Sequence, residues 1–495
     1  MTVPELRIQK CNHAAINTDG EFVLYWMTAN RRPGWNFILD RAIEHSKQLN
    51  KPLLVFEALR CGYKWASDRI HHFVISGMAD NVKAFEKKKA VYFPYVEPKP
   101  GDGAGLLEEL ARRSCLVVTD DFPCFFLPRM VAAVAKRLPV LLEKVDSNGI
   151  FPMRGTDRVF SRAHDFRRFL QKNLRPHLQE FPIAEPVKGL RIPKLDGIAS
   201  DIQKKWPSAD VTEIAMHPET LTDFRIDHSV VVTETRGGIK AAAKKLKSFG
   251  NDKLHRYEED RNQPEEDVAS GFSPYLHFGH ISIHEIFSRL MSDEEWSPND
   301  LAEKATGSKA GWWGCSPMAE AFLDELITWR EVGYNRCWQR DDYDQYESLP
   351  DWAQQTLEIH ANDPRPNIYS LEEFESAATH DDLWNAAQTQ LVHEGRIHNY
   401  LRMLWGKKIL HWSESPQAAL DIMIELNNKY ALDGRNPNSY SGIFWVLGRY
   451  DRAWGPEREI FGKIRYMTCE NTARKVRVKD YIKQFTSETT AKRSL

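Results

Sequence analysis

Tryptophan is concentrated in the second half of this sequence, where its indole side chains could carry charge. Trp405 and Trp412, two of 15 tryptophans, lie seven residues apart in YLRMLWGKKILHW. On one helix these two side chains share a face, about 10 Å apart along the axis, and a charge could hop between them. Tryptophans two turns apart also simply fill a core, so the spacing alone leaves both readings open.

A carboxyl and an indole form a second pattern, in FLDELITWREVGYN. Glu325 and Trp329 are four residues apart, and on the helix predicted after Ser316-Pro317 they face the same way. Such a pair could read a nucleobase, although Glu325 taken alone could equally be a solvated surface acid.

Small residues before a helix start form a third pattern, in DVASGFSPYLHFGHIS. Ser270, Gly271 and Ser273 could offer backbone N–H groups and hydroxyls to a diphosphate, or could simply cap an ordinary helix. Arg402 and Asp433 lie on segments around a turn, and either could be an ordinary surface charge.

The spacing of histidine, cysteine and glycine argues against other chemistries. The histidines of HEGRIH are five apart, whereas the zinc-protease pattern needs four, so we expect no metal. The seven cysteines form no CxxC pair, which favours a reducing compartment. The first strand-to-helix turn, MTANRRPGWNF, has no GxGxxG, so dinucleotide binding by a Rossmann fingerprint is not expected.

Two unlike halves must position these residues. Between residues 21 and 146, apolar runs (EFVLYWM, PLLVFEAL, AVYFPYV, CLVVTD, PVLLEKV) alternate with mixed segments, the pattern of a parallel sheet wrapped by helices. Beyond a Pro- and Gly-containing stretch, amphipathic segments take over, several opened by Ser-Pro at 273, 316 and 415. We predict an α/β domain over 1–182 (Rossmann-like), a linker over 183–210 and an all-helical domain over 211–495.

The charge balance and the apolar runs of the sequence limit the kinds of partner that the protein could bind. Lys and Arg total 67 against 69 Asp and Glu, so nucleic acid would have to bind a local basic surface. The N-terminus has no apolar signal core, and no run of eighteen apolar residues occurs. We expect a monomeric cytoplasmic protein without a membrane partner, associated with the nucleoid when bound to DNA.

The stretch from 253 to 482 resembles the class II cyclobutane pyrimidine dimer photolyases of the photolyase/cryptochrome family. The resemblance rests on ordered phrases: SPYLHFGHIS, PDWAQQTL, LWNAAQ, YLRMLWGKKILHW, KYALDGRNPNSYSG and EREIFGKIRYM. VLYWM and PLLVFEAL extend it weakly toward the N-terminus. It implies a photolyase fold, with an α/β domain before a helical FAD-binding domain, and repair of dimers in UV-damaged DNA by light-driven electron transfer from reduced FAD.

The resemblance also implies roles for individual residues. The FAD-binding positions are Tyr257, Ser270, Gly271, Phe272, Ser273, Asn399, Arg402, Asn427, Asp433 and Gly434, with the Asn427 amide near flavin N5. Glu325 falls at the dimer bases, Met403 between flavin and lesion, and Trp329 and Trp445 on the pocket walls. Trp384, Trp405 and Trp412 correspond to the electron chain, with Tyr369 as an auxiliary donor. Arg452, Trp454 and Arg465 match DNA contacts, which the basic run Arg474, Lys475, Arg477 and Lys479 continues.

Three departures and two alternatives accompany this resemblance. After Trp445, VLGRY is one residue shorter than the family pattern and WGPERE is one longer, so the DNA-side loop at 446–456 could be reshaped. Asn399 replaces the small residue usual in the class. The first-helix pattern matches poorly, so the antenna chromophore could be a deazaflavin, a folate or absent. A cryptochrome-like blue-light photoreceptor would keep the flavin and the tryptophans, but Glu325, Trp329, Met403 and Trp445 favour repair. A light-independent nucleic-acid-binding flavoprotein would have no use for an electron chain.

Overall fold

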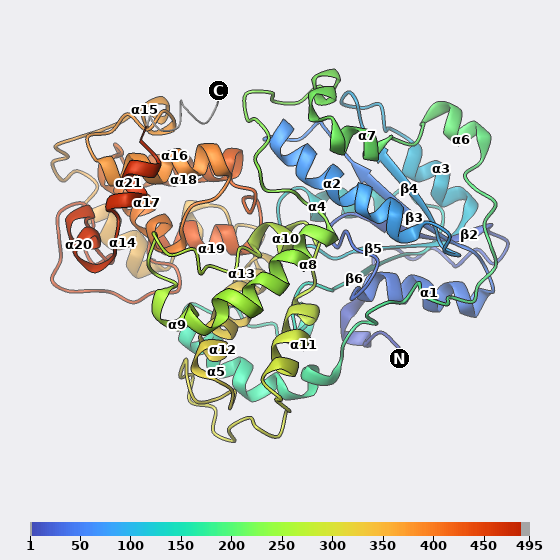
Figure 1. Cartoon of the computed structure of the whole chain (residues 1–495), viewed down its shortest axis with the longest axis horizontal. Helices are drawn as coiled ribbons and strands as arrows, with labels where there is room; N and C mark the ends of the chain where they lie inside the picture. The colour runs from blue at the N-terminus through green and yellow to red at the C-terminus, as the bar shows by residue number, and fades with distance from the viewer. Residues whose placement is uncertain (1, 487–495) are drawn as a thin grey trace. The chain divides into compact units, whose positions relative to one another are not determined.

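The computed structural model describes residues 2–486 and groups them in two compact units (Figure 1). Among the described residues, the α/β unit comprises 2–157, 174–247 and 272–298, and the helical unit comprises 158–173, 248–271 and 299–486. This grouping cuts the chain several times, whereas the predicted division into 1–182, 183–210 and 211–495 cuts it twice. Those predicted boundaries stay a prediction.

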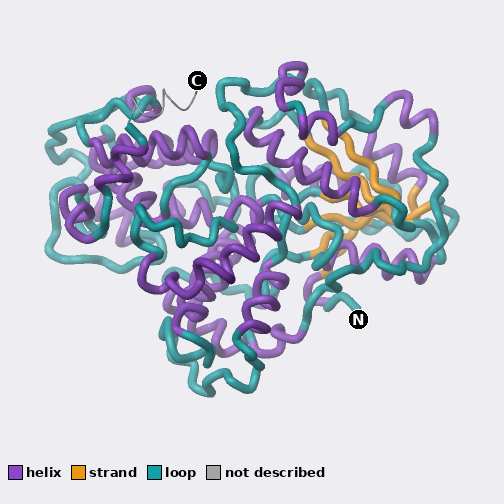
Figure 2. Tube along the Cα trace, in the orientation of Figure 1, coloured by secondary structure: helices purple, strands orange, loops and turns teal. Residues whose placement is uncertain are grey.

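The α/β unit is built on a six-stranded sheet in the order β1-β6-β5-β2-β3-β4 (Figure 2). Its parallel strands are β2 (Phe22–Met27), β3 (Leu53–Leu59), β4 (Val91–Val96), β5 (Ser114–Asp120) and β6 (Leu142–Val145). These are the five apolar runs predicted as strands. The edge strand β1 (Ile8–Lys10) pairs antiparallel with β6 and was not predicted, because three residues with one apolar side chain carry no periodic signal.

Helices cover both faces of this sheet. One face packs against α1 (Phe37–Leu49) and α2 (Asp68–Phe85), and the other against α3 (Leu106–Arg113) and α4 (Leu127–Ala135). The connecting helices change from one face to the other between β4 and β5, where the strand order reverses direction. Because the crossovers between parallel strands are right-handed, this reversal puts the later helices on the opposite face. Burial on both faces explains why the strands read as continuous apolar runs.

The predicted linker contributes to the core of the α/β unit. Val187, Leu190 and Ile192 are buried with α1 on one face of the sheet. Ile202, in α6 (Ser200–Lys205), and Trp206 are buried on the other face. The segment from 183 to 206 is therefore more than a surface connection.

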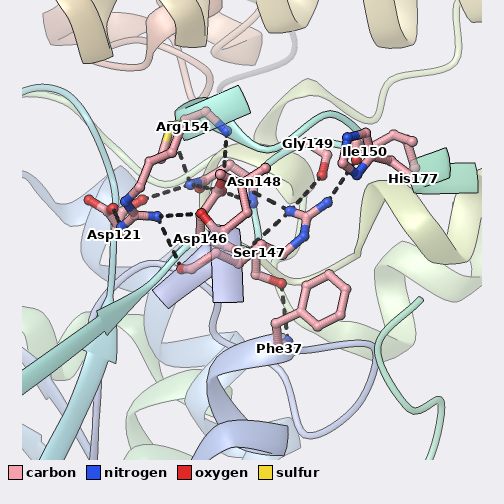
Figure 3. Close-up of polar contacts among 12 residues, drawn as sticks. Phe37, Asp121, Asp146, Ser147, Asn148, Gly149, Ile150, Arg154 and His177 are labelled. Atoms are coloured by element: carbon pink, nitrogen blue, oxygen red, sulfur yellow. Dashed lines mark hydrogen bonds and ion pairs between the residues drawn. The ribbon is translucent and has the colours of Figure 1, made fainter. Parts of the chain in front are cut away.

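Arg7 joins the N-terminal segment to the loop that follows β6. Figure 3 labels the residues of this loop from 146 to 150. The fully buried Arg7 guanidinium donates hydrogen bonds to the carbonyl oxygens of Asp146 (3.4 Å), Gly149 (3.2 Å) and Ile150 (2.7 Å). The Asp146 carboxylate in turn accepts the backbone N–H of Asn148 at 3.0 Å. These bonds fix the loop at the carboxyl edge of the sheet.

Arg7 Nη1 also lies 3.9 Å from Oδ2 of the buried Asp146 carboxylate. We expect Arg7→Met to lower the free energy of unfolding by about 3–5 kcal/mol, because the variant leaves this buried carboxylate without its cation. Urea unfolding followed by circular dichroism measures this loss. Arg112→Met is the control, since its side chain is 58% exposed and its ion pair with Glu109 is worth about 0–1 kcal/mol. Equal unfolding midpoints for the Arg7 variant and the wild type would contradict the prediction.

The helical unit surrounds its own core of tryptophans and aliphatic side chains. Between 211 and 486 the structure has no β-strand, as predicted. The described elements of this unit are α5 (Ala163–Asn173), η5 (Phe249–Lys253), η6 (Leu254–Arg256), α9 (Tyr257–Asp260), α12 (Pro317–Leu323), η7 (Asp324–Trp329), α13 (Arg330–Gln339), η8 (Tyr346–Ser348), α14 (Asp351–Ile359), α15 (Leu371–Glu375), α16 (Asp382–Glu394), α17 (Asn399–Trp412), α18 (Pro416–Tyr430), α19 (Pro437–Val446), α20 (Cys469–Lys475) and α21 (Lys479–Gln484).

Two of the three predicted Ser-Pro helix starts are confirmed. Ser316 and Ser415 cap α12 and α18 by accepting backbone N–H groups three residues on. Ser273 is instead the first helical residue of α10 (Ser273–His277), Phe272 is the N-cap, and no side-chain cap bond forms. Among the described helices, none combines the length and apolar character needed to span a bilayer.

Candidate functional site

Helix α17 is the centre of the candidate site. It packs against α16, α18 and α19. Its later turns are buried, including Trp405 and Trp412, whereas Asn399 is exposed and Arg402 and Met403 are half-buried. The first turns of α17 are therefore open to a ligand, while the rest of the helix belongs to the core.

The three tryptophans predicted to form an electron chain lie close together. The rings of Trp384 and Trp412 are 6.1 Å apart between centroids, and the Trp384 indole N–H donates to the backbone oxygen of Trp405 at 3.0 Å. Trp384, on α16, thus contacts both tryptophans of α17. The spacing of Trp405 and Trp412 suggested a direct hop, and the contacts of Trp384 with the ring of Trp412 and the backbone of Trp405 offer a second route.

Polar and aromatic neighbours extend this cluster at both ends. The indole N–H of Trp405 donates to Oε1 of the buried Gln388 at 2.9 Å. At the other end, the ring of Tyr369 lies 5.8 Å from that of Trp412. Trp384, Trp405 and Trp412 are nearly inaccessible to solvent, whereas Tyr369 is half-buried, so the cluster leads from the core toward the surface.

Glu325 and Trp329 lie on η7, a π-helical stretch between α12 and α13. Both side chains are half-buried, while Leu326, Ile327 and Thr328 between them are buried. Glu325 and Trp329 therefore share a partial exposure that the three residues between them lack, and their common orientation stays a prediction. A π-helical turn widens the helix and often marks a functional site, but nothing in the sequence pattern predicted it.

Arg261 holds the carboxyl of Glu325. Its Nη1 donates to Glu325 Oε1 at 2.9 Å, and its guanidinium lies over the ring of Tyr257, 5.6 Å from the centroid. Burial raises the pKa of Glu325, and Arg261 partly opposes this shift. Burial also raises the pKa of Tyr257, which keeps the phenol neutral. Tyr257 and Glu325, separate in the sequence analysis, thus share one cation.

Arg402 and Asp433, both predicted to bind FAD, form a salt bridge. Their contact is bidentate, with N···O distances of 3.0 and 3.2 Å, and the side chains are 22% and 13% exposed. On α18, the buried Asn427 donates its amide N–H to Ser439 Oγ at 2.6 Å. Ser439 is itself held by the Asn436 cap of α19, so the amide of Asn427 has a fixed orientation.

Gly434 allows the segment after α18 to approach the end of that helix. A Cβ at this position would lie 2.7 Å from the backbone oxygen of Asn427. We therefore expect Gly434→Ala to shift Asn427 and to lower the free energy of unfolding by about 1–3 kcal/mol. Thermal unfolding measures this loss, and Gly442→Ala, whose Cβ would meet nothing within 4 Å, is the matched control. Equal losses in the two variants would refute the packing argument.

His398, at the N-cap of α17, was not predicted from the sequence. Burial lowers its pKa to about 4, so the imidazole is neutral near pH 7. Its Nδ1 is buried without a hydrogen-bond partner among the described residues. The backbone N–H of Arg402 donates to its carbonyl oxygen at 2.8 Å. An unsatisfied ring nitrogen one turn before Arg402 marks a place for a polar ligand.

The predicted diphosphate-binding segment spans the boundary of the two units. Ser270 and Gly271 belong to the helical unit, and Gly271 has a positive φ of 68°. Phe272, which is buried, and Ser273, which is exposed, belong to the α/β unit. Only Ser270 and Gly271 are therefore placed in the same unit as Arg402 and Asn427.

Comparison with known proteins identifies the family. No protein-family model matches the chain. The deoxyribodipyrimidine photo-lyase of Methanothermobacter thermautotrophicus is 35% identical over 96% of this chain and 97% of that protein. Those of Potorous tridactylus and Arabidopsis thaliana are each 31% identical, over 97% and 93% of this chain and 85% and 88% of theirs.

The chain belongs to the deoxyribodipyrimidine photo-lyase family. The predicted family and enzyme class are thereby confirmed. A solved class III photolyase from Agrobacterium tumefaciens matches with a TM-score of 0.64 over 96% of this chain and 86% of that chain, at 16% identity. That likeness confirms the predicted fold, an α/β domain with a helix-rich remainder in the photolyase/cryptochrome architecture.

In this photolyase-family protein, the residues predicted to contact DNA stack in alternation. Arg465 lies over the rings of Trp445 and Trp454, 5.7 and 4.9 Å from their centroids, and Arg452 lies over Trp454 at 4.8 Å. Lys407 lies over Trp445 at 4.8 Å. Arg452 and Arg465 are exposed and the two indoles are half-buried, so the stack meets solvent at its two guanidinium groups.

Lys407 is a buried cation that the sequence analysis missed. Its Nζ donates to the backbone oxygen of Val446 at 2.5 Å, at the C-terminal end of α19, and burial lowers its pKa to about 7. Arg474, Lys475, Arg477 and Lys479 are all exposed, as a basic surface requires. Arg477, however, forms an ion pair with Glu266 at 2.6 Å, which offsets part of the charge of that run.

Proposed function

We propose that this protein repairs cyclobutane pyrimidine dimers in UV-damaged DNA by light-driven electron transfer from reduced FAD, as a class II photolyase. One observation carries the proposal. The contacts of Trp384 with Trp405 and Trp412 occur in the same helical unit as the Arg261–Glu325 and Arg402–Asp433 pairs. The tryptophans are oxidisable side chains, and the two ion pairs are polar groups suited to a base and a cofactor. Together they suit an enzyme that moves an electron between a cofactor and a nucleobase.

The residues around the start of α17 support FAD as the cofactor. The unsatisfied Nδ1 of His398 and the half-buried Arg402–Asp433 pair provide polar groups for a ligand. When bound, FAD would supply the photoexcitable electron donor. We assign its binding to Tyr257, Ser270, Gly271, Phe272, Ser273, Asn399, Arg402, Asn427, Asp433 and Gly434.

These side chains would tune the electrostatics of the cofactor. The Arg402 guanidinium stabilises negative charge on a bound ring, and Asp433 keeps that guanidinium in place. The Asn427 amide is neutral, so it can hydrogen-bond the ring before and after reduction. We assign no antenna chromophore: the alternatives are a deazaflavin, a folate or no antenna at all.

On the substrate side, we assign Glu325 to the dimer bases and Met403 to the space between lesion and cofactor. Arg261 orients the Glu325 carboxyl, and the raised pKa of that group favours a proton that could stabilise charge on the bases. Trp329 and Trp445 would form apolar walls. The lesion must leave the duplex to reach these residues. Photolyases in general act on a nucleotide that is flipped out of the base stack.

The stack of Arg452, Trp454 and Arg465 would contact the DNA around the flipped lesion. Guanidinium groups neutralise phosphates and release counterions, so affinity should fall as salt rises. The exposed run from Arg474 to Lys479 would add to this surface. We further propose that the protein acts as a monomer in the cytoplasm, at the nucleoid when bound to DNA.

Repair of a dimer-containing oligonucleotide under blue or near-UV light tests the proposal directly. Purified protein reconstituted with FAD should restore intact thymines in the light and leave the dimer untouched in a dark control. Flavin photoreduction without any repair would instead indicate a cryptochrome-like photoreceptor. A colourless protein that cannot be loaded with FAD would refute both functions.

A further inference from the structure

Tyr369 and His380 form a hydrogen-bonded pair at the end of the tryptophan cluster. The Tyr369 phenol oxygen lies 2.6 Å from His380 Nδ1, and the backbone N–H of His380 donates to the same oxygen at 3.1 Å. In the imidazole tautomer whose Nδ1 carries no proton, the phenol O–H donates to Nδ1 while the phenol oxygen accepts the backbone N–H. The imidazole is thus set to receive the phenolic proton.

Both rings of this pair contact Trp412. The Tyr369 ring lies 5.8 Å from the indole and the His380 ring 4.8 Å, each in an edge-to-face arrangement. The backbone N–H of Tyr369 also donates to the Trp412 oxygen at 3.0 Å. An electron leaving Tyr369 therefore has Trp412 as its immediate acceptor.

The surrounding chain holds the pair in place from both sides. Arg365, four residues before Tyr369, donates to the backbone oxygen of Leu410 at 2.9 Å, near the end of α17. On the other side, Thr379 Oγ1 bonds Asn385 Oδ1 at 2.7 Å, and the N–H of Asp381 bonds Thr379 Oγ1. The His380 side chain is exposed, so a proton accepted there can pass to water.

We propose that His380 is the proton acceptor that makes Tyr369 a terminal electron donor; this inference rests on the proposed light-driven chemistry. One electron passes from the Tyr369 phenol to the oxidised Trp412 indole, while the phenolic proton moves to His380 Nδ1. The products are a neutral Trp412, a neutral tyrosyl radical and an imidazolium, which releases its proton to solvent. The oxidant is the Trp412 radical cation, formed when the tryptophans supply an electron inward.

A neutral radical is a better terminus than a radical cation. After the proton has gone to His380, a charge returning to Trp412 must recover both the electron and the proton. The backbone N–H of His380 still bonds the phenoxyl oxygen, so that oxygen stays satisfied after the transfer. The pair would thereby slow charge recombination and lengthen the time available for external reductants to act.

The test is time-resolved detection of the tyrosyl radical in FAD-loaded protein after a blue flash. Because a general base contributes about a hundredfold or more, His380→Phe should slow radical formation by that factor. In the wild type, formation should be slower in D2O than in H2O. His380→Gly should regain the radical when imidazole is added, since His380 is exposed. His411→Gln is the matched control, because His411 also contacts Trp412, with ring centroids 6.3 Å apart, but has no bond to Tyr369.

A second arm separates this inference from the proposed function. A ruthenium photosensitiser with an external electron acceptor oxidises surface-proximal aromatic residues without any flavin. If the wild type gives no radical under blue light but a His380-dependent radical with ruthenium, the light-driven function fails and the Tyr369–His380 pair stands. If His380→Phe forms the radical at the wild-type rate in both arms, His380 is not the proton acceptor.

Discussion

Trp384→Phe is expected to slow the light-driven reduction of oxidised FAD at least about tenfold, which corresponds to about 1.4 kcal/mol of barrier. Phenylalanine is far harder to oxidise than an indole, and Trp384 is the side chain that contacts both Trp405 and Trp412. Bleaching of the oxidised flavin band under blue light with an external thiol measures the rate. Trp405→Phe should block the same reaction.

The electron chain should matter only for an oxidised cofactor. Trp384→Phe and Trp405→Phe should therefore repair dimers normally when FAD has first been reduced chemically. Trp313→Phe is the control, since Trp313 is also buried in the same unit and its ring contacts Trp312. Photoreduction at the wild-type rate in Trp384→Phe would remove Trp384 from the pathway.

Glu325→Gln is expected to lower the yield of dimer splitting by about ten- to a hundredfold, with FAD and DNA binding retained. An amide keeps the size of the carboxyl but cannot hold the same proton or the same bond with Arg261. Repair by the chemically reduced protein measures the yield, so the electron chain does not enter. Arg261→Met should show a smaller loss in the same direction, because it acts by orienting Glu325.

The control for this series is Glu358→Gln, an exposed carboxyl of the same unit. If Glu325→Gln splits dimers with the yield of the wild type, Glu325 has no role at the bases.

The same carboxyl gives a pH dependence with a definite sign. Burial raises the pKa of Glu325 in the folded protein, so the unfolded chain loses this proton first as pH rises. Its contribution to stability is therefore present below the pH at which the unfolded chain ionises, and it is lost as pH rises through the folded value. The unfolding midpoints of the wild type and Glu325→Gln should agree in acid, where the Glu325 carboxyl is protonated. At higher pH the midpoint of the wild type should fall below that of Glu325→Gln, because only the wild type ionises at this position.

Much of the fold could be predicted because burial leaves a periodic signal. The runs that became β2 to β6 are apolar on both faces, as strands covered by helices must be. β1 is short and polar, so only its pairing with β6 defines it. Ser273-Pro274 has the sequence of a capped helix start, yet the N-cap falls on Phe272, because a cap depends on backbone geometry that the residue types do not specify.

The candidate site was predictable where residues are close in sequence and not where tertiary packing brings them together. Glu325 and Trp329 are four apart, and their common orientation could be predicted, although the π-helical turn could not. Arg261 reaches Glu325 from 64 positions away. The bond between Trp384 and Trp405 likewise joins two helices, so the helix spacing of Trp405 and Trp412 alone could not show that Trp384 contacts both residues.

Side chains between residues 187 and 206 are buried on both faces of the sheet. This burial limits where the protein could be cut into separate fragments. A fragment ending at residue 182 would lack the side chains that seal the sheet, and apolar patches of this kind drive association of exposed surfaces. Truncation mutants designed at the apparent break in composition would therefore precipitate for a reason unrelated to catalysis. A workable excision has to carry Trp206 with it.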